Sequence, residues 1–142
     1  MPYTPDLSVV FDNMDAIIVG VGMTIAISVI AMSLALVVGL IVALLRLSKI
    51  APLSAAAGAY IQFFRGIPQY VFLIWLYYGI AMLTGINFAP LQAGIIALTF
   101  QYGGYLAEIY RAGIQAISKG QTESALSVGM TRSQAYRYVI LP

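Results

Sequence analysis

The sequence predicts an all-α integral membrane protein, and three observations support this prediction. Of its 142 residues, 61% are hydrophobic and only 8% are charged, which leaves too little polar surface to cover a soluble globule of this length. Two long runs, 16–45 and 66–107, contain no charged side chain. All lysines and arginines follow the first run, whereas all aspartates precede it.

Cysteine and histidine are absent, which excludes disulfide frameworks and the usual zinc, haem and thiol-nucleophile sites.

The first predicted membrane helix, TM1, spans 16–45. A bilayer core of roughly 30 Å needs about 20 helical residues, so this run crosses with length to spare and is too long for the apolar core of a signal peptide. Small residues recur at every fourth position of its second half, namely Ala31, Ala35, Gly39 and Ala43. This spacing predicts a face where another helix approaches closely, although alanine and glycine are also simply common in such helices.

Two further membrane helices are predicted after Arg46 and Lys49, which close TM1. The second uncharged run is too long for one span, and the turn-forming residues at 84–90 divide it. We therefore expect TM2 at 53–83 and TM3 at 91–112, with a kink in TM2 at Pro68.

The distribution of charge predicts the orientation of these helices. Cationic residues mark the cytoplasmic side of a membrane, and they follow TM1 and TM3 but are absent from the loop at 84–90. Residues 1–15 carry only acidic charges. We therefore expect an external N-terminus at 1–15, three crossings, and a cytoplasmic segment at 118–142.

The cytoplasmic segment is predicted to form two short helices around a glycine. Residues 122–128 are a helix candidate, Gly129 breaks it, and Thr131 with Gln134 matches a capping box that starts a second helix towards Ile140. One interpretation is an amphipathic segment that lies on the inner leaflet. The other is a docking element for a cytoplasmic partner.

The spacing of residues in this segment resembles the EAA motif of ABC importer permeases, which reads EAA, three residues, G, nine residues, I, x, LP. The chain matches it with Glu123, Ser124, Ala125, Gly129, Val139, Leu141 and Pro142. Ser124 replaces the first alanine of the motif, and Val139 takes the place of its isoleucine. The resemblance implies that these residues couple the chain to a separate ATPase.

Two other stretches are similar to signatures of the polar amino acid uptake branch of that family. YIQFFRGIPQ at 60–69 is similar to its second-helix signature, and GGYLAEIYRAGIQ at 103–115 is similar to its third. The resemblance implies a MetI-like ABC permease fold with about five membrane helices, of which three are present here. The sequence ends where the motif ends, so we expect either a fragment or a shortened subunit whose partner supplies the rest.

Polar residues inside the predicted spans are the candidates for a solute pathway. Gln101, Gly104, Tyr105 and Glu108 share one face of TM3. A carboxylate in lipid costs at least about 2.5 kcal/mol, so Glu108 should face protein or water. It either pairs with Arg111 or Arg65, or it lines the pathway and attracts an amino group. The predicted pathway residues are Arg65, Gln101, Tyr105 and Glu108.

The leading hypothesis is a permease subunit of an ATP-driven importer of polar amino acids, in the bacterial cytoplasmic (inner) membrane. The sequence lacks a Gly-x-x-x-x-Gly-Lys-Ser/Thr phosphate loop, so we expect ATP to be bound by a separate partner subunit. We expect no catalytic residues, no metal and no cofactor in this chain itself. The resemblance implies as partners ABC ATPase subunits, a second permease subunit, an extracytoplasmic solute-binding protein and the lipid bilayer, and no nucleic acid.

An intramembrane protease is excluded, because the rhomboid type needs histidine and the aspartyl type needs aspartates within the membrane. A non-transporting scaffold or sensor that keeps the docking segment is the alternative.

Overall fold

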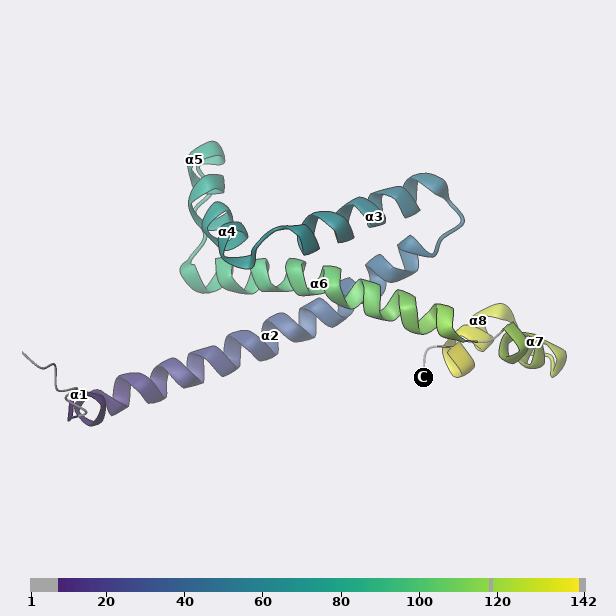
Figure 1. Ribbon diagram of the computed structural model, residues 1–142, viewed down its shortest axis with the longest axis horizontal. Coiled ribbons are helices and arrows are strands. Elements are labelled where there is room, and N and C mark those ends of the chain that lie inside the picture. The colour runs from purple at the N-terminus through teal and green to yellow at the C-terminus, as the bar shows by residue number, and fades with distance from the viewer. Residues whose placement is uncertain (1–7, 118, 141–142) are drawn as a thin grey trace, which may run out of the picture.

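The computed structural model describes residues 8–117 and 119–140, which form helices joined by short connections (Figure 1). The helices in chain order are α1 (Ser8–Asp12), α2 (Met14–Arg46), α3 (Ala51–Gly66), α4 (Gln69–Ile74), the π-helical turn η1 (Trp75–Gly79), α5 (Ile80–Thr84), α6 (Pro90–Ala116), α7 (Lys119–Ser127), α8 (Arg132–Ala135) and the π-helical turn η2 (Tyr136–Ile140). No strand occurs within these described residues, so the predicted all-α class is confirmed.

Helices α2 and α6 cross closely, and the small residues of α2 form the contact. The small residues at every fourth position are all buried, as their spacing predicts: Ala31, Ala35, Gly39 and Ala43. A Cβ atom added at Gly39 would lie 2.7 Å from the Cβ of Leu106 and 3.2 Å from the amide nitrogen of Ala107. The two backbones therefore approach more closely here than any larger side chain permits.

The first half of α2 has no helix beside it within the described chain, and in Figure 1 it projects alone towards α1. Its buried residues begin only at Ala31, and large apolar side chains such as Ile18 and Ile25 are exposed. Such a surface is stable in lipid or against another membrane helix. Among the described residues, α2 is long and apolar enough to cross a membrane, and the bent pair formed by α3 and the helices up to Thr84 would be a second crossing if it counts as one span. Helix α6, which carries glutamines, tyrosines and glycines, does not meet the same criterion, so the third crossing stays a prediction.

The predicted TM2 at 53–83 is not one kinked helix. It is divided into α3 and the continuous helical arm from α4 to α5, and the two arms are bent by 104°. Pro68 has no amide hydrogen and forces the residue before it out of the helical region, and Ile67 accordingly has φ −95° and ψ 132°. The prediction located the proline correctly but underestimated the bend, because a break of two residues turns the chain more sharply than a kink within a continuous helix.

Two apolar clusters hold these arms to α6. Val42, Ala43, Ala57, Ile61 and Ala107 join α2, α3 and α6, while Phe72, Leu76, Ala93 and Ala97 join α4 and η1 to the start of α6. Tyr60 links the first cluster to the middle of α6, because its hydroxyl donates a 2.7 Å hydrogen bond to the carbonyl oxygen of Phe100. The rings of Phe64 and Phe100 stack with centroids 5.7 Å apart.

The C-terminal segment forms two short helices that turn at Gly129. Gly129 has φ +86°, a left-handed conformation that glycine adopts without the steric penalty of a Cβ atom. The predicted capping box is confirmed, since Thr131 N–H donates to Gln134 Oε1 at 2.8 Å and Gln134 N–H donates to Thr131 Oγ1 at 3.3 Å. Ala125 and Ala135 are buried between the two arms.

Candidate functional site

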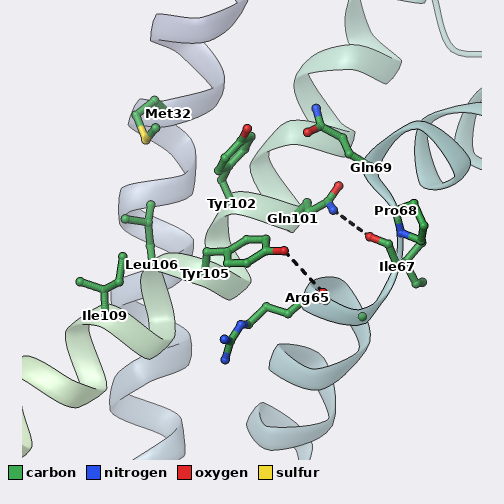
Figure 2. A pocket seen from close by; sticks show the side chains of 11 residues that line it. Met32, Arg65, Ile67, Pro68, Gln69, Gln101, Tyr102, Tyr105, Leu106 and Ile109 are labelled. Carbon is green, nitrogen blue, oxygen red and sulfur yellow. Dashed lines mark hydrogen bonds between the residues drawn. The ribbon is translucent and has the colours of Figure 1, made fainter.

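The break between α3 and α4 forms one side of a cavity of about 700 Å³, and α6 forms the other. Figure 2 shows its lining side chains, which are Met32, Arg65, Ile67, Pro68, Gln69, Gln101, Tyr102, Tyr105, Leu106 and Ile109, together with the backbone of Gly66. Three of the four predicted pathway residues, Arg65, Gln101 and Tyr105, therefore lie around one cavity. Met32 on α2, Gln69 on α4 and Tyr102 on α6 were missing from the predicted set, and the break at Pro68 is the sequence signal that could have identified Gln69.

Gln101 supports the broken backbone directly. Its Nε2 donates a 2.9 Å hydrogen bond to the carbonyl oxygen of Ile67, which the break leaves without a helical partner. The residue is 5% exposed, and within the described chain its Oε1 has no hydrogen-bond partner. An unpaired acceptor in an apolar environment is costly, and this oxygen is enclosed by the surrounding protein atoms.

Tyr105 and Arg65 form the lower part of the cavity in the view of Figure 2, where the Arg65 side chain lies beneath the tyrosine ring. The guanidinium carbon of Arg65 lies 5.6 Å from the centre of that ring, within the range of a cation–π contact. The Tyr105 hydroxyl is 3.5 Å from the carbonyl oxygen of Arg65, which is a long hydrogen bond. Within the described residues no carboxylate pairs with Arg65.

Glu108 does not line this cavity. It faces a second, smaller pocket of about 280 Å³, together with Arg46, Gly58, Ile61, Gln62, Arg65 and Arg111. Its carboxylate forms a salt bridge with Arg111, whose Nε donates to both carboxylate oxygens at 3.1 Å. Of the two pairings considered from the sequence, the structure therefore shows the one with Arg111, and Arg65 is the residue shared by both pockets.

The predicted coupling residues lie on the helix pair at the far end of α6 (Figure 1). Glu123 and Ser124 are exposed on α7, Ala125 is buried, and Val139 is half-buried on η2. A shallow surface hollow between α7 and η2 is lined by Ser124, Ala125 and Val139, among others. Leu141 and Pro142, the last two residues of the motif, lie outside the described residues.

No group of three or more acidic residues that could hold a metal ion occurs within the part of the chain that the structure describes.

Comparison with known proteins identifies the family of this chain. The family described as "Binding-protein-dependent transport system inner membrane component" matches residues 35–142. The probable glutamine ABC transporter permease protein GlnM of Bacillus subtilis (strain 168) is 39% identical over 137 residues, which cover 96% of this chain and 63% of the relative. The glutamate/aspartate import permease protein GltK of Escherichia coli O157:H7 is 34% identical over 147 residues, covering 99% of this chain and 66% of the relative.

A solved structure shows the same fold. A chain from the crystal structure of an amino acid ABC transporter with histidines superposes with a TM-score of 0.87 at 39% identity, covering 99% of this chain and 65% of that chain. A chain of the MetNI methionine ABC transporter superposes with a TM-score of 0.61 at 27% identity. The chain thus spans about two thirds of the length of GlnM, GltK and the first of these transporter chains.

Proposed function

Because the chain belongs to the family of binding-protein-dependent transport system inner membrane components, in the polar amino acid branch of ABC importer permeases, we propose that it forms part of a permease that moves polar amino acids into the cell. The observation that carries this proposal is the similarity along nearly the whole chain to a chain of an amino acid ABC transporter. None of the relatives named above supports the alternative of a non-transporting scaffold or sensor.

The cavity at the break after α3 is the proposed solute site. An amino acid carries an ammonium and a carboxylate, and both lose water on entering a narrow site unless charges or strong dipoles replace that hydration. Broken helices supply such dipoles, because the C-terminal end of a helix carries partial negative charge. Here the carbonyl end of α3 would bind the ammonium, and the guanidinium of Arg65 would bind the carboxylate.

The helix pair α7–α8 is the proposed ATPase-docking element. The tight turn at Gly129 and the capped second helix would let the pair move as one unit when the ATPase changes its nucleotide state. ATP would be bound and hydrolysed by that separate subunit, so this chain is a transport component and not an enzyme. A second permease subunit and an extracytoplasmic solute-binding protein would complete the assembly, with residues 1–15 outside the cell and 118–142 in the cytoplasm.

Uptake by the assembled transporter in proteoliposomes tests the proposal. We expect ATP-dependent uptake of labelled polar amino acids that unlabelled amino acids compete for and sugars do not. Among the described residues that line the cavity, Arg65 alone is charged, and Arg65→Gln removes this charge. Hydrogen bonds to charged groups contribute about 1.5–3 kcal/mol, so KM should rise by at least about tenfold. Lys49→Gln removes an exposed charge outside the cavity and serves as the matched control.

Two results would contradict parts of this proposal separately. Uptake of sugars in place of amino acids would disprove the transport function. An unchanged KM in Arg65→Gln, at normal protein level and with normal ATPase binding, would leave the function intact but would exclude this cavity as the solute site.

A further inference from the structure

A small basic pocket lies where α2, α3 and α6 meet, and the proposed solute site does not account for it. It has a volume of about 280 Å³, and one arginine reaches it from each helix, Arg46 from α2, Arg65 from α3 and Arg111 from α6. The rest of its lining is Gly58, Ile61, Gln62 and Glu108. Three cations thus share a space with one anion.

The single carboxylate of the pocket is already occupied. Glu108 accepts hydrogen bonds from Arg111 at both of its oxygens, so its direct ion pair is with that arginine, while the charges of Arg65 and Arg46 act on it from a greater distance. Arg46 donates through one nitrogen to the carbonyl oxygen of Ser54 at 3.1 Å and to its hydroxyl at 2.8 Å, and both of these partners are uncharged. Arg65 contacts the ring of Tyr105 but has no carboxylate partner among the described residues. Three arginines and one glutamate therefore give the pocket a net charge of +2.

Contacts with Gly58 and Ser54 on α3 fix the position of the Arg46 side chain in this pocket. The guanidinium carbon of Arg46 would lie 3.3 Å from a Cβ atom at Gly58, so the absence of a side chain there lets the arginine rest against the backbone of α3. The hydroxyl of Ser54 donates in return to the carbonyl oxygen of Arg46 at 2.9 Å. A guanidinium fixed in this way loses little conformational freedom when it binds an anion.

The position of the pocket indicates the source of that anion. Arg46 is the last residue of α2, the most apolar helix of the chain, so it lies where that helix leaves the hydrocarbon core. Headgroup phosphates lie at this depth, and basic pockets between membrane helices bind anionic headgroups. Arginine is suited to phosphate because its planar fork of donors matches two phosphate oxygens. Leu45 and Leu53, at the adjoining ends of α2 and α3, are exposed and could contact acyl chains.

We propose that this pocket binds the phosphate group of an anionic phospholipid, in the leaflet where α2 ends. The inference requires that the chain lies in a membrane, but it does not depend on amino acid transport. The lipid would act as a fourth partner to the three helices. Its phosphate would pair directly with Arg46, while Arg65, which also lines the solute cavity, would contribute only its nearby charge, and the contact would stabilise the junction at which α3 packs on α2 and α6.

Native mass spectrometry of the full chain, delipidated and titrated with dioleoylphosphatidylglycerol, tests the proposal. Gln62 offers a sharp variant, because it lines the pocket, is exposed and makes no hydrogen bond in the described structure. Gln62→Glu should weaken phosphatidylglycerol binding by about fivefold, the ratio that corresponds to about 1 kcal/mol per charge near an anionic surface, and Gln62→Lys should strengthen it by a similar factor. The double variant Arg46→Gln/Arg65→Gln should weaken binding by at least about tenfold.

The matched control is Arg132→Gln/Arg137→Gln, which removes the same charge from exposed positions on the C-terminal helix pair. It should leave phosphatidylglycerol affinity unchanged, and dioleoylphosphatidylcholine should bind more weakly than phosphatidylglycerol to every variant that keeps the pocket. Equal affinity for the two lipids would overturn the proposal, as would an equal loss of affinity in the control. Displacement of the lipid by micromolar inorganic phosphate would show a site for a free anion and would also overturn it.

Discussion

A single added methyl group at Gly39 should separate α2 from α6. In Gly39→Ala the new Cβ would lie 2.7 Å from the Cβ of Leu106, 3.2 Å from the Ala107 amide nitrogen and 3.2 Å from the Gly103 carbonyl oxygen. Cβ atoms do not approach to 2.7 Å, and the atoms in the way are backbone or attached directly to it. A rotamer change therefore cannot relieve the contact, and the helices must move apart.

The magnitude follows from comparison with a second glycine of the same helix. A Cβ at Gly22 meets no atom within 4 Å, so Gly22→Ala introduces the same change in helix propensity without the steric contact. Because the propensity gain of up to about 1 kcal/mol is common to both variants, it cancels in their difference. Overpacking typically costs about 1–3 kcal/mol, and we expect Gly39→Ala to be less stable than Gly22→Ala by that amount.

The assay is SDS titration in mixed micelles, with unfolding followed by circular dichroism for the parent and both variants. A difference of about 1–3 kcal/mol corresponds to a change of about 5-fold to 150-fold in the ratio of folded to unfolded protein, which this titration resolves. Equal unfolding free energies for Gly39→Ala and Gly22→Ala would refute the close approach of α2 and α6 at Gly39.

Three further variants test other contacts. Gln101→Leu leaves the Ile67 carbonyl without its 2.9 Å donor in an apolar setting, so the free energy of unfolding in the same titration should fall by about 1–3 kcal/mol. A loss no larger than that of Gln62→Leu, at an exposed glutamine without a hydrogen bond in the described structure, would contradict the supporting role. Tyr60→Phe removes the 2.7 Å bond to Phe100 and should cost about 1 kcal/mol, whereas the exposed Tyr70→Phe should cost nothing measurable. Gly129→Asp places a side chain at φ +86° in the proposed docking element, so it should abolish uptake or ATPase co-purification while membrane insertion persists, and normal uptake with normal co-purification would disprove the docking role.

The features that could be predicted from the sequence are those with a local physical cause. The buried face of α2 follows from small residues at every fourth position, because that spacing places them on one side of a helix. The turn at Gly129 and the capping pair of Thr131 and Gln134 depend on residues within a few positions of each other. The salt bridge between Glu108 and Arg111 joins residues three positions apart and was one of the pairings expected.

The features that could not be predicted depend on contacts between distant segments. Proline at position 68 predicts an interruption, but the angle of 104° depends on how the arm from α4 to α5 packs on the start of α6. The partner of Gln101 is a backbone carbonyl that lies 34 positions earlier in the chain, and no periodicity reveals it. For the same reason the shared face of Gln101 and Glu108 on α6 did not show that the two residues face different pockets.

The break after α3 explains why Arg65 can take part in two pockets. If α3 continued through Ile67 and Pro68 as one helix, the chain would not change direction beside α6. The carbonyl oxygens at this point would then accept helical hydrogen bonds. Ending α3 at Gly66 exposes its last carbonyls, and non-helical backbone at membrane depth persists only where protein or a water-lined cavity satisfies it. Gln101 donates a hydrogen bond to the carbonyl oxygen of Ile67 and thereby stabilises the break against α6. Arg65, the residue before Gly66, lines both the cavity and the basic pocket. A change in the position of its side chain would therefore alter both.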